Sequence, residues 1–317
     1  QLHLWEKGYP IWIPKYVSQI LLRGDDMLQI ITDSACDLPQ QVADDHNIDI
    51  IPFIVNIDGQ EYVDGKTIQP ADVYDAIRKG KQPSTSQVPA NYFWETFTNY
   101  AQKGARCLYV AFSSKLSGTC NTARLVAKEV KQRYPDFELT ICDSLSGSLA
   151  QGLIALEAAQ LTSAGVADTE VIDRAKARSQ SNVEHLFTVD DLGHLHRGGR
   201  IGWASAVMGS MLKVKPILHV KDGQMLLLQK ARGKNTALKR IVEILKERSL
   251  GNTDQLIGIT HADDGETAQR LQAMLESTLG YKNFLVNIVG SVLGCHIGLG
   301  GVAAFFVNKD YEVPNLP

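Results

Sequence analysis

Cysteine is scarce in this sequence and is not arranged in pairs. Its 317 residues include five cysteines, an odd number, and no two stand in a Cys-x-x-Cys spacing. A disulfide framework needs paired cysteines and a structural zinc site needs short ligand spacings, so both are excluded. Isolated thiols are typical of the reducing cytoplasm, where cysteine serves as a small core residue. The five are Cys36, Cys107, Cys120, Cys142 and Cys295.

Long apolar runs and a basic charge balance are also missing. No run approaches the roughly eighteen apolar residues of a membrane span, so no integral membrane segment is predicted. The net charge is −3 and the pI about 6.3, which gives no basic surface for nucleic acid. The sequence has no Walker-type phosphate loop, no Gly-x-Gly-x-x-Gly and no Gly-x-Ser-x-Gly turn. It therefore lacks the usual nucleotide loops and the nucleophile turn of α/β-hydrolases.

Residues 1–26 differ from the rest of the chain. They contain Trp and Pro without clear periodicity, and they lack the basic start, apolar centre and cleavage site of a signal peptide. We expect an extension that is not part of the fold. An arm that contacts the fold or another subunit is the alternative.

From Met27 onward, short apolar runs alternate with helical patterns. Runs such as Leu28–Ile31 and Cys107–Phe112 are typical of buried strands, and Thr119–Arg133 has the pattern of a helix. This alternation predicts a parallel sheet with right-handed crossovers. Loops after the strands then share one edge of the sheet, where ligands of such folds bind.

The pattern changes near residue 180. Val214–Val220 and Gln224–Leu228 flank Lys221-Asp222-Gly223, a strong signal for an antiparallel hairpin. We therefore predict an α/β protein of two domains. Residues 27–180 would form a parallel-sheet α/β domain, and residues 181–311 an α+β domain with a mixed or antiparallel sheet.

One turn has the properties of an anion site. Ser113–Thr119 is rich in hydroxyl groups and lies between the predicted strand Cys107–Phe112 and the predicted helix Thr119–Arg133. Free backbone N–H groups and the positive end of the helix dipole favour an anion there. The alternative is that Ser117 only caps the helix.

Two further polar groups lie in segments shaped by proline or glycine. Thr85 and Ser86 fall in Pro83–Pro89, which we predict to be a loop between two helices, and His296 lies in a glycine-rich segment. Hydroxyls and an imidazole can together hold a carboxylate, and histidine can also supply a charge. The sequence does not show whether these groups meet.

Charged groups between residues 190 and 201 admit two interpretations. In Arg197-Gly198-Gly199-Arg200, two guanidinium groups could meet a phosphate or an acidic partner, or could pair with nearby acids. The neighbouring Asp and His residues match no strong zinc spacing, so we interpret them as a solvated loop and predict no metal site.

These motifs, in this order, resemble the DegV family. The resemblance runs from about Met27 to Asn308 and is specific as an ordered set rather than motif by motif. It is carried by Ile31-Thr32-Asp33-Ser34, Thr85-Ser86-Gln87, Ser113-Ser114-Lys115-Leu116-Ser117-Gly118-Thr119, Gly198-Gly199-Arg200-Ile201 and His296-Ile297-Gly298.

The resemblance implies a bacterial protein that binds a long-chain fatty acid between two domains. It implies no cofactor and no catalysis by this chain alone. A separate ATP-dependent fatty acid kinase subunit would phosphorylate the bound carboxylate. Matched by motif, Thr85, Ser117 with Gly118, and His296 would hold the carboxylate, while Arg200 and Arg232 would contact the kinase subunit.

Two alternatives and two departures accompany this prediction. Ser117 and His296 would also suit a stand-alone acyl-group hydrolase or transferase, and another apolar carboxylic acid, such as an isoprenoid acid, would suit the carrier. Val88 separates the Thr-Ser-Gln motif from Pro89, where the family often has proline at once, and Cys120 stands where an aromatic is common. Ser84 beside Thr85 leaves open which hydroxyl faces the ligand.

Overall fold

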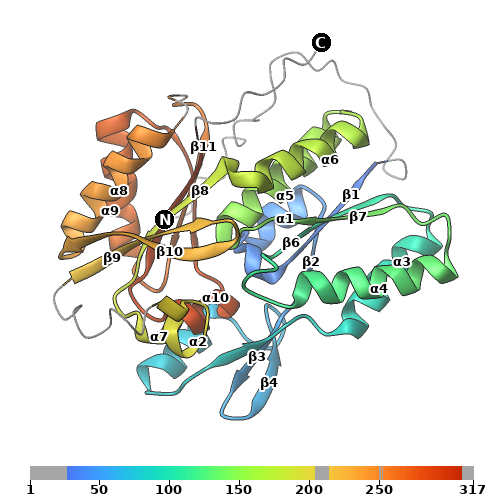
Figure 1. Cartoon of the computed structure of the whole chain (residues 1–317), viewed down its shortest axis with the longest axis horizontal. Coiled ribbons are helices and arrows are strands. Elements are labelled where there is room, and N and C mark those ends of the chain that lie inside the picture. The colour runs from blue at the N-terminus through green and yellow to red at the C-terminus, as the bar shows by residue number, and fades with distance from the viewer. Residues whose placement is uncertain (1–26, 204–213, 250, 252, 309–317) are drawn as a thin grey trace.

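The computed structural model describes residues 27–203, 214–249, 251 and 253–308. The predicted extension at residues 1–26 and the last residues of the predicted second domain, 309–311, lie outside the described residues. The described chain contains a four-stranded, a three-stranded and a six-stranded sheet (Figure 1).

The four-stranded sheet is entirely parallel, as the sequence predicts. One of its two central strands, formed by residues 107–111, is buried at all five positions, because helices cover both faces of the sheet. Such burial explains why this strand is an uninterrupted apolar run. In spatial order the strands are β2 (Ile48–Ile51), β1 (Gln29–Asp33), β6 (Cys107–Ala111) and β7 (Leu139–Asp143). The helices that accompany them are α1 (Gln40–Asp45), α3 (Ala90–Gln102), α4 (Thr119–Arg133), α5 (Ser148–Ser163) and α6 (Asp168–Ala177).

The three-stranded sheet corrects one prediction. It consists of β4 (Gln60–Val63), β3 (Ile54–Ile57) and β5 (Ser84–Ser86), with α2 (Pro70–Arg78) between β4 and β5. The prediction that Pro83–Pro89 is only a loop is wrong, because its middle pairs antiparallel with β3. A strand of three hydroxyl residues has no apolar alternation that could reveal it, and only its backbone makes the ladder.

The six-stranded sheet is mixed, and all its strands follow residue 182. Only β11 and β12 pair in parallel, while the other neighbours are antiparallel. The order is β10 (Gln224–Arg232), β9 (Val214–Lys221), β8 (Val183–Thr188), β13 (Val302–Val307), β11 (Leu256–His261) and β12 (Asn283–Ile288). The helices α8 (Lys234–Arg248) and α9 (Gly265–Leu279) lie together over one face of this sheet (Figure 1).

The helix α5 packs between the two large sheets. It contacts β1 and β6 of the parallel sheet and β8, β11 and β13 of the mixed sheet. A helix buried on all sides needs apolar residues around its whole circumference, and α5 has them. Its one carboxylate, Glu157, is buried and pairs with Arg174 at 3.2 Å and Arg178 at 2.7 Å, which offsets the cost of burying the charge.

Short helical segments complete the described chain. They are the 3₁₀ turn Ser34–Cys36, the π-helical turn Arg178–Asn182, α7 (Gly193–Arg197) and α10 (Ser291–Ile297). The region around Asp190–Ile201, interpreted as a solvated loop, therefore contains a helical turn. The glycine-rich segment with His296 is also helical, although glycine disfavours helix.

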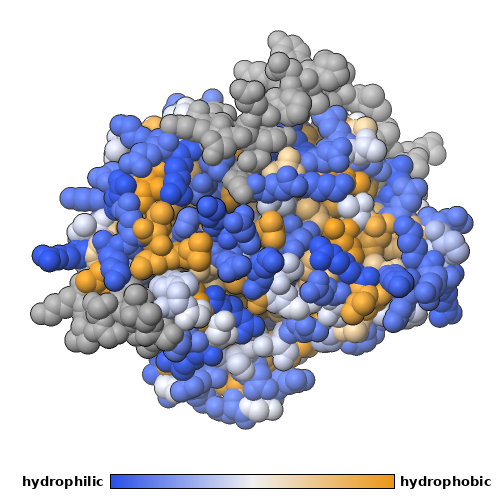
Figure 2. Space-filling model, viewed as in Figure 1, coloured by the Kyte–Doolittle hydropathy of each residue, from blue (hydrophilic) through white to orange (hydrophobic). Residues whose placement is uncertain are grey.

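The surface and core agree with the composition. The face shown in Figure 2 is largely hydrophilic, with hydrophobic residues in scattered groups. All five cysteines are buried and free, as their spacing predicts. Within the described ranges, no helix is both long enough and apolar enough to span a bilayer.

Candidate functional site

An apolar cavity lies where the parallel half and the mixed sheet meet. It holds about 850 Å³ of space between atoms, its open mouth included. Loops after the parallel strands supply one wall, and β8, β9, β11, β13 and α10 supply the other. The apolar residues that line it are Phe53, Phe112, Leu116, Phe187, Leu195, Val220, Met225, Val289, Val292, Leu293, Ile297, Val302, Ala303 and Phe305.

Thr85 and His296 meet at this cavity, although 211 positions separate them in the chain. Thr85 Oγ1 lies 2.8 Å from His296 Nε2. Pairing with β3 turns Thr85 inward and leaves Ser84 and Ser86 exposed, because successive side chains of a strand point to opposite faces. Thr85, not Ser84, therefore faces the cavity.

Ser117 also lines the cavity, and its hydroxyl serves the start of α4. Its Oγ lies 2.9 Å from Thr119 Oγ1 and accepts a hydrogen bond from the Thr119 N–H at 3.2 Å. The N-cap residue of α4 is Gly118, which makes no side-chain cap bond, so Ser117 contacts the first residue of the helix without being its cap. Gly118 is exposed and is not among the residues lining the cavity. A Cβ there would lie 2.2 Å from Gln87 Oε1, the end of a flexible, exposed side chain that can move aside.

His296 is neutral at pH 7 in this structure. Burial, with a smaller contribution from the positive charge of Arg200 and from the neighbouring His194, lowers the pKa of His296 to about 4. The imidazole therefore contributes a hydrogen bond, and the charge expected of it is carried by the arginine instead.

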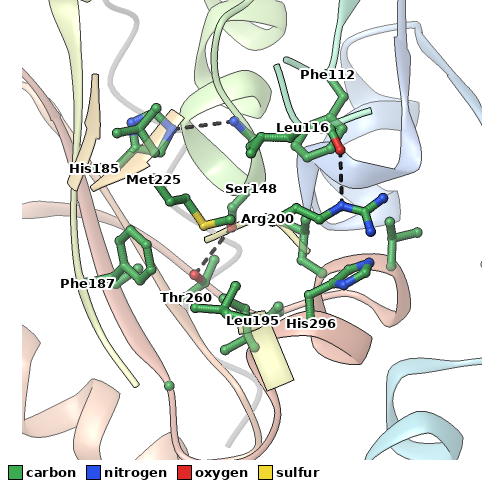
Figure 3. Close-up of a pocket in the computed structure, with 18 of the residues that line it drawn as sticks. Phe112, Leu116, Ser148, His185, Phe187, Leu195, Arg200, Met225, Thr260 and His296 are labelled. Atoms are coloured by element: carbon green, nitrogen blue, oxygen red, sulfur yellow. Dashed lines mark hydrogen bonds between the residues drawn. The ribbon is translucent and has the colours of Figure 1, made fainter. Parts of the chain in front are cut away.

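Arg200 lines the cavity rather than only the surface. Figure 3 shows its side chain above His296, with the guanidinium turned toward the Leu116 carbonyl. Its Nε donates to Leu116 O at 3.2 Å, and its Nη1 donates to Gly198 O. Burial lowers the pKa of Arg200. Arg232 lies exposed at the end of β10 and does not line the cavity.

Asp33 positions the loops around the cavity. Its buried carboxylate accepts hydrogen bonds from Tyr109 Oη at 2.7 Å, Phe112 N at 2.9 Å and Gln151 Nε2 at 3.0 Å. Burial nevertheless raises the pKa of Asp33. The sequence left open whether this residue faces a ligand or ties its turn, and the structure shows that it joins β1, β6 and α5.

A second polar group in the cavity was not found from the sequence. Ser148 and Thr260 both line it, with their hydroxyl oxygens 3.4 Å apart (Figure 3). Ser148 Oγ also donates to Asp37 Oδ2 at 2.5 Å, and Gly290 N donates to Asp37 Oδ1 at 2.9 Å. Burial raises the pKa of Asp37 to about 7. No local motif marks these residues, because they meet only through the packing of α5 against the mixed sheet.

The geometry does not resemble a nucleophile–base pair. Catalysis by Ser117 would need its hydroxyl bonded to the imidazole, but His296 bonds Thr85 and Ser117 bonds Thr119.

The two acids before α7 bind groups of the protein itself. Asp190 pairs with Lys215 at 2.9 Å, and Asp191 accepts a hydrogen bond from Gly193 N at 2.7 Å.

Sequence relatives support the predicted family. A family model described as an uncharacterised protein of the DegV family matches residues 27–309. A DegV domain-containing protein of Clostridium perfringens is 38% identical over 286 residues, which cover 89% of this chain and 98% of the relative. Another, from Listeria monocytogenes, is 30% identical over 280 residues, covering 88% and 97%.

Solved structures share the fold. "Fatty Acid Binding of a DegV family Protein from Thermus thermophilus" matches with a TM-score of 0.79 and 29% identity, covering 89% of this chain and 99% of that one. A stearic acid-binding protein from Eubacterium ventriosum matches at 0.81 and 25%, with the same coverage. DegV, a fatty acid binding protein from Bacillus subtilis, matches at 0.77 and 27%, also with the same coverage. Because the family model spans nearly the whole chain after residue 26, this chain belongs to the DegV family.

Proposed function

We propose that this protein binds a long-chain fatty acid in the cavity between its two halves. The carboxylate lies at the end formed by Thr85, Ser117, Arg200 and His296, and the acyl chain runs along the apolar lining. The observation that carries this proposal is the contact of Thr85 with His296 at one end of a mainly apolar cavity. The relatives solved as fatty-acid-binding proteins support the same ligand class.

The acyl tail and the carboxylate contribute differently to the binding free energy, because most of the cavity lining is apolar. Burying a sixteen-carbon tail contributes on the order of 11 kcal/mol gross, at roughly 0.8 kcal/mol per CH₂. Association and ordering offset much of this. A hydrogen bond to a charged carboxylate contributes about 1.5–3 kcal/mol. The tail therefore supplies most of the affinity, and the polar end fixes which end of the ligand faces outward.

We further propose that the chain presents the carboxylate to a separate ATP-dependent kinase subunit and is itself not an enzyme. Phosphoryl transfer depends mainly on positioning and charge stabilisation, and a carboxylate held at a fixed place meets that need. Gly118 and Gly199 are exposed beside the residues of the polar end, so a partner can approach there. Arg232 remains a second candidate contact for that partner.

The domain division and the location of the protein belong to the same proposal. We place the domains at residues 27–180 and 181–311, since no described sheet shares strands across this boundary. Buried free thiols fit a cytoplasmic protein.

Mass spectrometry of the purified, denatured protein tests the ligand class. We expect free long-chain fatty acid to be released. A covalent acyl adduct on Ser117 would instead indicate an acyl-group enzyme. Release of another apolar acid, such as an isoprenoid acid, would mean that the protein carries that acid and not a fatty acid.

Thr85→Val tests the polar end, because valine keeps the shape of threonine and removes its hydroxyl. We expect the affinity for palmitic acid to fall about tenfold, the value of one hydrogen bond to a charged group. Ser84→Ala is the matched control, since Ser84 is exposed on the opposite face of β5. Equal affinities of the two variants in a fluorescent-lipid displacement titration would contradict the assignment.

A further inference from the structure

His185 closes the cavity at the end opposite Arg200 and His296. Figure 3 shows its ring on the opposite side of the pocket from Arg200 and His296, with Met225 and Phe187 nearby. His185 and Val220 line this cavity and also a second one, which encloses about 1060 Å³ with its mouth included. Residues that line two cavities are the wall between them, so this wall is one side chain thick.

The two cavities differ in character. The first is mainly apolar, whereas the second is lined largely by polar and charged residues. The polar and charged residues of the second cavity include Ser179, Gln180, Glu184, His219, Lys221 and Arg248. A wall between them separates an apolar ligand in the first cavity from the polar lining of the second.

The structure holds both wall residues in place. In the antiparallel pairing of β8 with β9, Leu186 faces His219 and Phe187 faces Leu218, so continuing this register sets Val220 opposite His185. The His185 ring is 5% exposed, stands edge-on to Phe305 at 5.5 Å, and accepts a hydrogen bond from Gly147 N at 3.4 Å. Burial lowers the pKa of His185 to about 3, so the ring is neutral at pH 7 beside an apolar chain.

We propose that His185 and Val220 form the end wall of the acyl site and set the longest chain that the protein binds. This inference rests on the proposed fatty-acid function. Each added methylene strengthens binding until the terminal methyl reaches the wall. A longer chain must then displace well-packed side chains, which weakens binding.

Binding of palmitic, stearic, arachidic and behenic acids to delipidated protein tests this inference. We expect the wild type to show a maximum of affinity followed by a fall with longer chains. His185→Ala joins the two cavities, and we expect its ratio of behenic to palmitic affinity to exceed the wild-type ratio by about tenfold or more. Val220→Ala thins the same wall and should shift the ratio in the same direction.

His219→Ala is the matched control, because His219 lines only the second cavity of the two. It makes the same chemical change without opening the wall, and we expect the wild-type chain-length profile. If His185→Ala does not fold, Val220→Ala decides the question.

The outcomes separate this inference from the proposed function. If the wild type binds none of the four acids, the proposed fatty-acid function is wrong, and the inference about the end wall is wrong as well. A wild type that binds them without an upper limit, or wall variants that keep the wild-type profile, overturns the end wall alone.

Discussion

Arg200 and Arg232 are the two arginines that the family resemblance assigns to a partner subunit, but the structure places them differently. Arg200 lies in the cavity beside His296 and contributes to that residue's low pKa, whereas Arg232 is exposed on β10. A guanidinium near a neutral imidazole attracts a carboxylate. We therefore expect Arg200 to act on the ligand as well as on any partner.

Arg200→Ala should weaken palmitic acid binding by about ten- to a hundredfold, because a charge-assisted hydrogen bond contributes about 1.5–3 kcal/mol. The affinity for hexadecanol, which has the same tail but no charge, should change much less. Isothermal titration of both ligands separates the two effects.

Arg232→Ala serves as the control for this comparison, since it removes the same group outside the cavity. It should bind palmitic acid as the wild type does. If Arg200→Ala also retains full affinity for the acid, Arg200 does not touch the carboxylate, and a contact with the partner subunit remains its assigned role.

The sequence singles out three of the four residues of the polar end, but it assigns Arg200 to a partner and does not reveal the residues that support the site. Thr85, Ser117 and His296 stand out because hydroxyls and an imidazole occur in segments shaped by proline or glycine, and all three line the cavity. Asp37 and Ser148 are not predictable in this way. Their hydrogen bond joins residues 111 positions apart, and no local pattern encodes such a meeting.

Long elements were the most predictable. The predicted bounds of α4, Thr119–Arg133, agree with the structure at both ends, because this segment has a clear helical periodicity. The short elements were missed for the opposite reason. β5 is wholly hydroxylic, and α10 contains Gly294 and is only seven residues long. Tertiary contacts, not propensity, hold these two elements.

The packing of α10 against α2 illustrates this dependence. Tyr74 of α2 is fully buried, and its hydroxyl donates to Val289 O at 2.8 Å, just before α10. A Cβ on Gly294 would lie 3.0 Å from that hydroxyl oxygen, so glycine allows the close approach. This contact fixes the helix that carries His296.

Tyr74→Phe should lower the free energy of unfolding by about 1–2 kcal/mol, because it leaves a buried carbonyl without its donor. Urea unfolding measures the change. Tyr62→Phe on the partly exposed strand β4 makes the same substitution and should cost less than about 0.5 kcal/mol. Equal losses in the two variants would show that the Tyr74 hydrogen bond does not fix this junction.

At the scale of the whole molecule, hydrogen bonds around the cavity join the two halves. Ser113 donates to Gly223 O at 2.8 Å, and Asn287 donates to Asp37 O at 2.8 Å. The Thr85–His296 contact and the Arg200–Leu116 contact also cross the junction. Each bond takes one partner from each half, so ligand binding and the fit of the halves depend on the same contacts.

Asp37 makes this junction sensitive to pH. Burial, with a smaller contribution from the nearby charge of Asp64, raises its pKa to about 7, whereas an aspartate in the unfolded chain titrates at about 3.9. The folded state therefore holds the proton more tightly. Its contribution to stability is fully present below about pH 4 and is lost as the pH rises through about 7, by about 4 kcal/mol in all.

Asp37→Asn removes this titration and keeps both hydrogen bonds, since the amide oxygen can accept from Gly290 N and the amide nitrogen can donate to Ser148 Oγ. We expect the variant to gain stability over the wild type as the pH rises from about 4 to about 7, by up to about 4 kcal/mol. Urea unfolding of both proteins across this range measures the difference. Burial also raises the pKa of Asp33 and Asp64. Both residues are present in each protein, so the difference curve reports Asp37 together with its charge interaction with Asp64. If the free energies of unfolding of the two proteins changed with pH in parallel, Asp37 would stay ionised across this range and the proposed pH dependence of the junction would be wrong.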